Sequence, residues 1–289
     1  MTIPIKQLKN GYEMPVFGFG TWQIGGDTRR NPVNDDLGQT AALVRAIEAG
    51  VTHIDTAERY AAGHAEEIVA EAIKNFDRTK LFIVSKVWPD HLKYKDVLKS
   101  AMASLKRLKA DYLDIYLIHM PNHAIPITET MKAMDKLKSE GLLKNIGVSN
   151  FSVASLQEAQ SVSPNKIVVN QVHYNLIYRE PERSGLLSFC QKNDIFLEAW
   201  RPVEKGMLAG GGIHLLDTLC RKYNKSPAQI AINWLIFQKN VVTLAKMVNE
   251  KHLAENLNSF GWEMEKEDIE KLRQDFPGQK SISGAVPLQ

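Results

Sequence analysis

Eight short runs rich in β-branched and aromatic residues alternate with amphipathic stretches along this chain of 289 residues, and this alternation constrains the fold more than any other feature. In one amphipathic stretch, Val97, Ala101, Leu105 and Leu108 recur at the spacing of a single helical face. The pattern predicts eight strands separated by helices, the strands covering residues 16–21, 52–57, 81–87, 112–119, 145–150, 167–174, 195–200 and 241–246.

Strict alternation of strand and helix favours parallel strands joined by right-handed crossovers. Eight such units within roughly 250 residues are typical of a TIM barrel. A doubly wound sheet is the competing architecture, but the segment Gly18-Phe19-Gly20 lacks the third glycine of a dinucleotide-binding fingerprint. We therefore predict an α/β protein, a (β/α)8 TIM barrel that forms one domain over residues 1–289.

A hairpin is expected before the first barrel strand. Residues 3–6 and 14–17 flank Lys9-Asn10-Gly11, and Asn-Gly tolerates positive φ at both central positions of a type I′ turn. We expect this hairpin to close the barrel floor. Beyond the eighth strand the sequence predicts two helices and a short tail containing Gly, Ser and Pro, at residues 250–257, 266–276 and 277–289 respectively.

The overall charge and the cysteines exclude several classes of protein. The chain has 36 basic and 33 acidic residues, a net charge of +3, and no dense basic run that could follow a nucleic-acid backbone. Cys190 and Cys220 lie in helix-like segments without CxxC spacing, which fits a reducing compartment. No segment has the apolar character of a signal peptide or a membrane span. We expect a cytoplasmic monomer that contacts neither nucleic acid nor membrane.

Ionisable side chains end three of the predicted strands. Catalytic groups of TIM barrels lie at the carboxyl ends of the strands, so Asp55, Tyr60, Lys86 and His119 are predicted to converge on one rim. Each alone has an ordinary explanation: a helix cap, a packed aromatic, a surface charge or a core histidine. Taken together they favour a site, because Asp55 and Lys86 lie in apolar runs where an unpaired charge is costly.

These four residues would suit the reduction of a carbonyl group. A free tyrosine has a pKa near ~10, and a neighbouring ammonium lowers it by stabilising the phenolate. We expect Lys86 to lower the pKa of Tyr60 in this way, with Asp55 holding Lys86 charged and in place. His119 could hydrogen-bond the substrate carbonyl beside the Tyr60 hydroxyl.

Five segments resemble, in order and approximate spacing, the successive signatures of the aldo-keto reductases. They are Phe17-Gly18-Phe19-Gly20-Thr21-Trp22, Asp55-Thr56-Ala57-Glu58-Arg59-Tyr60, Ser85-Lys86-Val87-Trp88, Gly147-Val148-Ser149-Asn150-Phe151 and Asn170-Gln171-Val172. The resemblance spans nearly the whole chain. It implies the barrel fold, the catalytic tetrad Asp55, Tyr60, Lys86 and His119, and Tyr60 as the general acid.

The resemblance also implies an extended nicotinamide cofactor, NADPH with NADH possible, bound across the top of the barrel. Ser149, Asn150 and Gln171 match the positions that hold the nicotinamide carboxamide, which offers one acceptor and two donors. Trp200 stands where the family usually has the tyrosine that stacks on the nicotinamide ring. The other cofactor positions that it implies are Gly20, Thr21, Trp22, Asp55, Arg201, Val203, Lys246, Met247, His252, Glu255 and Asn256.

The chain departs from the family pattern at the phosphate end. Lys246 is retained, but Met247 follows it where the family commonly has serine, and His252 occupies the usual arginine position. A neutral histidine offers one donor where arginine offers a planar fork. The sequence therefore predicts NADPH use with poorer discrimination against NADH, unless another cation such as Arg201 compensates.

The predicted substrate pocket is lined by Trp22, Trp88, His119 and Met120. A short segment follows the last helix, whereas a long loop covers the pocket in selective family members, so we expect an open site that accepts varied small carbonyls. Arg29 and Arg30 lie in a loop on the same side, either to attract anionic substrates or as solvated surface charges.

Three alternative functions remain open. One is a cofactor-binding regulatory barrel without turnover, and another is a sugar or alcohol dehydrogenase that works mainly in the oxidative direction. The third is a metal-dependent hydrolase or isomerase that uses His119 and His123. Pro121 between these histidines argues against a helical ligand pair, and we expect no metal.

Overall fold

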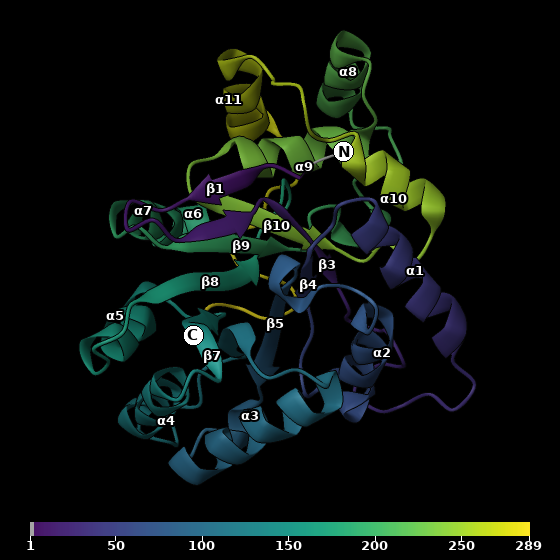
Figure 1. Ribbon diagram of the computed structural model, residues 1–289. Coiled ribbons are helices and arrows are strands. Elements are labelled where there is room, and N and C mark those ends of the chain that lie inside the picture. The colour runs from purple at the N-terminus through teal and green to yellow at the C-terminus, as the bar shows by residue number, and fades with distance from the viewer. Residues whose placement is uncertain (1–2) are drawn as a thin grey trace.

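Eight parallel strands close into a barrel in the computed structural model, which describes residues 3–289 (Figure 1). Their order around the barrel is β10-β3-β4-β5-β6-β7-β8-β9. Each strand lies within or overlaps one predicted run, so the predicted barrel is confirmed. The strands are β3 (Phe17–Gly20), β4 (His53–Asp55), β5 (Phe82–Val87), β6 (Leu113–Ile118), β7 (Leu143–Ser149), β8 (Ile167–His173), β9 (Phe196–Trp200) and β10 (Val241–Ala245).

Helices surround the barrel (Figure 1). Several of them bury a single apolar face, as amphipathic patterning predicts. In α3 the predicted apolar stripe of Val97, Ala101, Leu105 and Leu108 is buried. The α-helices are α1 (Asp36–Glu48), α2 (His64–Ile73), α3 (Tyr94–Leu108), α4 (Ile127–Ser139), α5 (Val153–Ser161), α6 (Glu180–Arg183), α7 (Leu186–Lys192), α8 (His214–Tyr223), α9 (Pro227–Phe237), α10 (Glu250–Leu257) and α11 (Lys266–Asp275). Short 3₁₀ turns are η1 (Tyr60–Gly63), η2 (Arg78–Lys80), η3 (Pro89–His91) and η4 (Glu204–Gly206). Within residues 3–289, no helix combines the length and apolarity that crossing a bilayer demands.

The predicted hairpin lies against the amino ends of the last two barrel strands. It consists of β1 (Ile5–Gln7) and β2 (Glu13–Pro15), paired antiparallel. The Lys6 ammonium donates to the carbonyl oxygen of Val241 at 2.7 Å, where β10 begins. The Lys9 amide donates to the Asp194 carboxylate at 2.9 Å, shortly before β9. The expectation that the hairpin closes the barrel floor is therefore confirmed.

The turn of this hairpin differs from the predicted type I′ form. Gly11 has a φ of 86°, whereas Asn10 is not among the residues with positive φ. The Gly11 amide donates to the Leu8 carbonyl at 2.9 Å, and the Leu8 amide donates to the Tyr12 carbonyl at 2.8 Å. These bonds close a three-residue loop in which only the glycine is left-handed. The type I′ prediction is wrong because it assumed a two-residue loop.

Side-chain alternation divides the barrel interior into an apolar lower layer and a polar upper layer. Successive strand residues point to opposite faces, so residues two apart share the inner face. On β5 this pairs Val84 below with Lys86 above, and on β9 it pairs Phe196 with Glu198. Val84 and Phe196 belong to a buried cluster that also contains Met14 of the hairpin. The charged groups therefore lie near the carboxyl ends of the strands, above an apolar plug.

The predicted tail returns to the carboxyl ends of β7 and β8. The C-terminal label in Figure 1 stands beside β7. The Gln289 amide donates to the Asn150 carbonyl at 3.0 Å. The Ser283 hydroxyl lies 2.7 Å from the His173 ring. The tail is thus short, as expected, but it packs on the rim of the barrel.

Gly147 of β7 provides a test of packing in the barrel wall. A Cβ atom here would lie 2.4 Å from Leu117 Cδ2 and 2.5 Å from Val169 Cγ1. We expect Gly147→Ala to lower the free energy of unfolding by about 1–3 kcal/mol, as overpacking does. Urea denaturation measures this change. Gly210→Ala is the matched control, because nothing lies within 4 Å of the added methyl group. Equal stability of both variants would contradict the packing argument.

Candidate active site

A buried ion pair between Lys86 and Asp55 lies at the carboxyl ends of β5 and β4. The Lys86 ammonium is fully buried and donates to an Asp55 carboxylate oxygen at 2.6 Å. It also donates to the Thr56 carbonyl at 2.9 Å and to the Tyr60 hydroxyl at 3.1 Å. Although burial opposes it, the charge of Asp55 helps to raise the pKa of Lys86 above its usual value. Lys86 is therefore an ammonium with all three N–H donors used.

Tyr60 is presented to this ammonium by the turn η1. Ala61 and Ala62 of the turn have φ values of 50° and 54°, a left-handed conformation that is costly for alanine. The Ala61 amide donates to the Asp27 carbonyl at 2.7 Å, which helps to hold the turn. The Tyr60 ring packs edge-on against Trp22, with 5.1 Å between ring centroids.

The pKa of Tyr60 differs in direction from the sequence-based prediction. Burial raises the pKa of Tyr60 above its usual value and outweighs the lowering effect of the Lys86 charge. Lys86 acts in the predicted direction, but the prediction of a lowered pKa is wrong. The prediction omitted the loss of solvent around the phenol, which disfavours its charged form. Tyr60 therefore keeps its proton at neutral pH.

His119 follows β6 and faces the same centre. Its ring lies edge-on to Tyr60 and to Trp88, with centroid distances of 5.7 and 5.1 Å. Burial, together with the charge of Lys86, lowers the pKa of His119 well below its usual value. The imidazole is therefore neutral and carries one N–H donor. The structure thus brings together all four predicted catalytic residues.

Below the ion pair a polar column extends into the barrel. The side-chain amide nitrogen of Gln171 donates to Asp55 at 2.8 Å and to Glu198 at 2.7 Å. The other Glu198 oxygen lies 3.2 Å from His53 Nε2. Burial raises the pKa of Glu198 to about 8, with a further contribution from the charge of Asp55. Burial also lowers the pKa of His53 to about 3, so Glu198 holds the proton at neutral pH.

The residues predicted to bind the carboxamide form one group at the ends of β7 and β8. The Ser149 hydroxyl donates to the Gln171 carbonyl at 2.8 Å, and the Asn150 side-chain amide donates to Ser149 Oγ at 2.9 Å. The buried Asn150 Oδ1 has no hydrogen-bond partner among residues 3–289. Both Gln171 amide hydrogens are directed at carboxyl groups, which leaves its oxygen available. Two unoccupied acceptors therefore suit the two N–H donors of a carboxamide.

The segment after β9 contains the other residues predicted near the nicotinamide. Trp200 is half-buried and stacks on His173 with a centroid distance of 4.1 Å. The Arg201 guanidinium lies 5.1 Å from the Trp200 ring centroid and 3.9 Å from a Glu204 oxygen. Val203 immediately precedes η4.

The residues predicted for the adenine and phosphate end lie after β10. Lys246 is exposed, and its ammonium donates to the Gln23 side chain at 3.2 Å. Met247 is 1% exposed, so its side chain faces the protein interior. Asn249 caps α10, which carries the exposed His252 and, on its last turn, Glu255 and Asn256. Among the side-chain hydrogen bonds and ion pairs of residues 3–289, none joins Lys246 to His252, Glu255 or Asn256.

Gly20, Thr21 and Trp22 form the end of β3 and the residues directly after it. A Cβ at Gly20 would lie 2.6 Å from a Leu244 methyl group, so the backbone of β3 packs closely against the Leu244 side chain. The buried Thr21 hydroxyl has no hydrogen-bond partner among residues 3–289. The predicted cofactor positions therefore follow the rim from β3 around to β10.

Two of the predicted substrate walls contact the tetrad, since Trp22 packs against Tyr60 and Trp88 packs against His119. Trp22, Trp88 and Met120 are each partly exposed at the rim. The Trp88 amide donates to the Glu58 carboxylate at 2.7 Å, and the Arg59 guanidinium lies 4.9 Å from the Trp88 ring centroid. In residues 3–289 no group of three or more His, Cys, Asp or Glu side chains is arranged to hold a metal ion.

With this geometry established, comparison with known proteins identifies the family. The sequence pattern of the aldo/keto reductase family matches residues 16–274. The chain is a member of this family. The glyoxal reductase of Bacillus subtilis is 36% identical over 268 residues, covering 92% of this chain and 90% of that protein. A methylglyoxal reductase of Escherichia coli is 34% identical over 278 residues, covering 95% of each.

Solved aldo-keto reductases share the fold across nearly the whole chain. A thermostable aldo-keto reductase in complex with the inhibitor epalrestat superposes with a TM-score of 0.90 at 44% identity, covering 93% of this chain and 98% of that one. An aldo-keto reductase of Klebsiella pneumoniae in complex with NADPH has a TM-score of 0.85 at 30% identity, covering 97% and 98%.

Several polar residues of this reductase were not predicted from the sequence. Glu198 carried the same signal as Asp55, an acidic residue inside an apolar run of a predicted strand. His53 also lies in such a strand, directly before Ile54 and Asp55. His173 and Ser283 carried no usable signal, because 110 residues separate them and their contact depends on the path of the tail.

Glu198 makes the free energy of unfolding of the reductase depend on pH. Because the pKa of Glu198 is raised to about 8 in the folded state, unfolding releases its proton from about pH 4.5 upwards, and stability falls until about pH 8. We expect Glu198→Gln to gain stability relative to wild type by up to about 4 kcal/mol between pH 5 and pH 9. Urea denaturation at each pH measures the difference. Glu263→Gln, the same change at an exposed position, should show none. A pH-independent difference for Glu198→Gln would show that this carboxyl is already ionised at pH 5.

Proposed function

We propose that this protein reduces small aldehydes and ketones with NADPH, and that Tyr60 donates the proton to the carbonyl oxygen. The observation that carries this proposal is the position of the Lys86 ammonium, which contacts both the Asp55 carboxylate and the Tyr60 hydroxyl inside the barrel. Membership of the aldo/keto reductase family and relatives named as reductases support carbonyl reduction.

The residues at the rim fit a nicotinamide cofactor. Asn150 Oδ1 and the Gln171 side-chain oxygen would accept from the carboxamide, and the Ser149 hydroxyl joins the Asn150 side-chain amide to the Gln171 backbone carbonyl. Trp200 would stack on the ring. The Klebsiella pneumoniae relative holds NADPH, which supports the same cofactor here. NADPH supplies the hydride.

Tyr60 and its neighbours would manage the proton. The raised pKa of Tyr60 keeps the hydroxyl protonated at neutral pH, which a reductase requires of its acid. When the proton leaves, the phenolate forms 3.1 Å from the Lys86 ammonium, which stabilises it. Neutral His119 has one N–H with which to orient the carbonyl oxygen beside Tyr60.

Small carbonyls, including 2-oxoaldehydes, are the proposed substrate class. Two relatives are named as reductases of glyoxal and methylglyoxal. The partly exposed Trp22 and Trp88 provide apolar walls near Tyr60. The tail hydrogen-bonds Asn150 and His173 at the ends of β7 and β8, and within residues 3–289 none of its hydrogen bonds reaches Trp22 or Trp88.

The function is tested by following NADPH absorbance with a panel of aldehydes, ketones and keto sugars. We expect reduction of several small carbonyls and a loss of about 10²–10⁴-fold in kcat for Tyr60→Phe, the usual contribution of a general acid. NADPH affinity should be retained. Tyr223→Phe is the matched control, because its hydroxyl bonds Asp268 at a distance from the site. Full reductase activity of Tyr60→Phe would show that another group donates the proton.

The residues predicted to bind the 2′-phosphate of NADPH favour weak discrimination between NADPH and NADH. His252 replaces a bidentate arginine, Met247 is buried, and the Glu250 carboxylate at the start of α10 is paired with Arg45 at 3.1 Å. We expect wild type to use both NADPH and NADH, and His252→Arg to raise the NADPH/NADH ratio of kcat/KM by about tenfold. Met247→Ser should change the ratio less, because position 247 faces the interior. A strong NADPH preference in wild type would show that another cation, such as Arg201, binds the phosphate.

A further inference from the structure

His173, at the end of β8, is held by hydrogen bonds at both ring nitrogens. Its Nε2 lies 2.7 Å from a Glu204 carboxylate oxygen, and its Nδ1 lies 2.7 Å from the Ser283 hydroxyl. His173 is 3% exposed and Ser283 is 5% exposed. A residue of the C-terminal tail is thus bonded to a buried side chain of the barrel rim.

Each group in this series of hydrogen bonds, Ser283, His173 and Glu204, can be assigned one protonation state. Burial lowers the pKa of His173 despite the nearby carboxylate, so the ring is neutral and has one donor and one acceptor. Although burial opposes it, the hydrogen bond from His173 lowers the pKa of Glu204, which is therefore a carboxylate. His173 Nε2–H donates to Glu204, and Nδ1 accepts from the Ser283 hydroxyl. Ser283 Oγ in turn accepts from the amides of Ala285 at 3.1 Å and Val286 at 3.0 Å.

These bonds exclude a hydrolytic role for Ser283. A Ser–His–carboxylate chain is the arrangement that activates a nucleophilic serine. Here the Ser283 oxygen is buried and already accepts two amide hydrogens, so its lone pairs are not free to attack a substrate. The group therefore has a positioning role.

The His173 ring, held by Ser283 and Glu204, packs against Trp200. His173 and Trp200 are stacked, with 4.1 Å between centroids and 6° between planes. Tyr178 stacks on His173 with a centroid distance of 4.2 Å. Trp200 is the residue proposed above to stack on the nicotinamide. Its plane is therefore set by a histidine whose own orientation depends on the tail.

The backbone that follows Trp200 is strained, and contacts to Arg201 and Glu204 hold it in place. Arg201, Glu204 and Lys205 have φ values of 59°, 42° and 54°, a conformation that is costly for residues other than glycine. The Asn175 side-chain amide donates to the Arg201 carbonyl and to the Glu204 carboxylate, both at 2.9 Å. Such strain persists where surrounding contacts enforce it, and it clusters at ligand sites.

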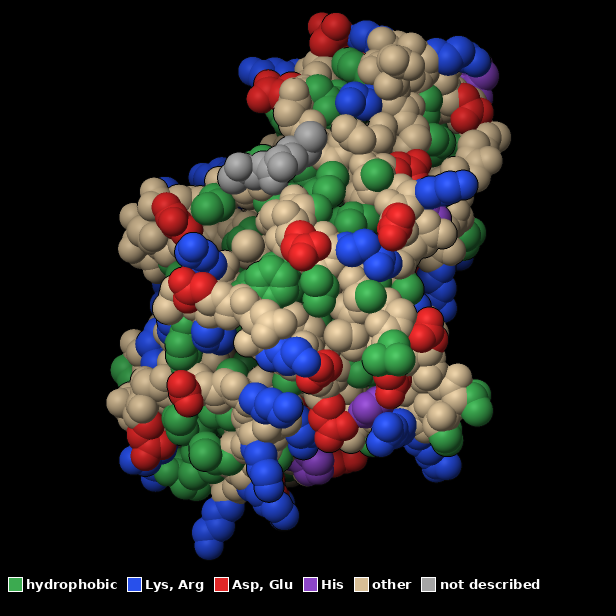
Figure 2. Space-filling view, turned by 45° about the vertical axis from the view of Figure 1, so that its right-hand side comes forward, with side chains coloured by type: hydrophobic (Ala, Val, Ile, Leu, Met, Phe, Trp, Pro, Cys, Tyr) green, Lys and Arg blue, Asp and Glu red, His purple; other side chains and the backbone are tan. Residues whose placement is uncertain are grey.

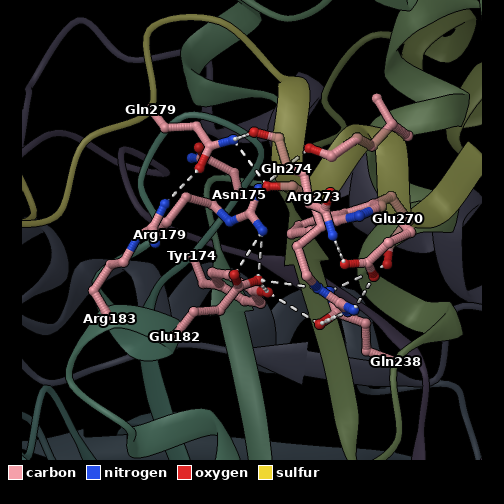
Figure 3. A network of polar contacts seen from close by, with 12 residues as sticks. Tyr174, Asn175, Arg179, Glu182, Arg183, Gln238, Glu270, Arg273, Gln274 and Gln279 are labelled. Carbon is pink, nitrogen blue, oxygen red and sulfur yellow. Dashed lines mark hydrogen bonds and ion pairs between the residues drawn. The ribbon is translucent and has the colours of Figure 1, made fainter.

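The tail is anchored at several points around Ser283. The Glu180 carboxylate accepts from the Ser283 amide at 2.9 Å and from the Leu288 amide at 3.2 Å. Before this, Gln279 donates to the Arg273 carbonyl at 2.9 Å, in the network of Figure 3 that joins α11 to the end of β8. The fully buried Arg179 forms a two-point ion pair with Glu182 at the centre of that network. The position of Ser283 is therefore fixed from both sides.

We propose that the C-terminal tail is part of the nicotinamide site: Ser283 orients His173, and His173 in turn holds Trp200 in the plane that receives the nicotinamide ring. Ser283 and His173 are thus positioning residues for cofactor binding. This inference rests on the proposed function, because it assigns the nicotinamide to Trp200. Without the Ser283 hydroxyl the ring-stacking arrangement is populated only part of the time, which weakens apparent cofactor affinity by that fraction.

The test measures two dissociation constants by titration calorimetry. NADPH probes the whole cofactor site, and adenosine 2′,5′-bisphosphate probes only the adenine and phosphate end. We expect Ser283→Ala to weaken NADPH binding by about three- to tenfold, the usual effect of one hydrogen bond. Binding of the bisphosphate should change by less than about twofold, since it carries no nicotinamide. His173→Phe, which keeps an aromatic ring but loses both hydrogen bonds, should follow the same pattern. Ser281→Ala, an exposed serine of the same tail, is the matched control.

Three results would overturn the inference. The first is an NADPH dissociation constant for Ser283→Ala that equals the wild-type value. The second is equal weakening of NADPH and of the bisphosphate, which would indicate a general structural effect. The third is the same change in Ser281→Ala. If wild type bound no NADPH, the proposed function would fail together with the inference, whereas wild-type binding without a Ser283 effect would overturn the inference alone.

Discussion

The buried Lys86–Asp55 ion pair is the constraint around which the upper barrel is built. Moving two charges out of water costs several kcal/mol for each ion, and the pair is tolerated only where hydrogen bonds satisfy the remaining donors and acceptors. Lys86 uses its three N–H groups on Asp55, the Thr56 carbonyl and Tyr60, while Gln171 donates to the other Asp55 oxygen. The Tyr60 phenol is therefore one of the partners that satisfy the hydrogen-bonding needs of the buried charge.

The sequence was sufficient to predict the barrel because apolar residues follow different patterns in its strands and in its helices. Parallel strands buried on both faces appear as short apolar runs, and the helices between them show a single apolar stripe. The same contrast predicted the tetrad, since Asp55 and Lys86 interrupt apolar runs at the carboxyl ends of neighbouring strands. Charges in such positions need partners, and the barrel topology leaves few places for those partners to lie.

What the sequence could not predict depends on distances between elements. The turn type of the hairpin depends on its three-residue loop, which the preference of the Asn10-Gly11 dipeptide did not reveal. The pKa of Tyr60 depends on how much solvent the folded barrel removes, which no motif records. His173 and Ser283 meet only because the tail folds back over β8. Glu198, by contrast, was detectable, because an acidic residue inside a predicted strand is the signal that identified Asp55.

The protonation states of the buried groups around Tyr60 are consistent with its proposed role as the acid. His119 and His53 are neutral because burial lowers the pKa of each, and the raised pKa of Glu198 leaves that carboxyl protonated at neutral pH. The charges of Lys86 and Asp55 then balance each other. A phenolate formed at Tyr60 would be a new negative charge, and it would form directly against the ammonium. Were Glu198 ionised as well, its negative charge would oppose the phenolate, so the neutral carboxyl below the ion pair favours proton release above it.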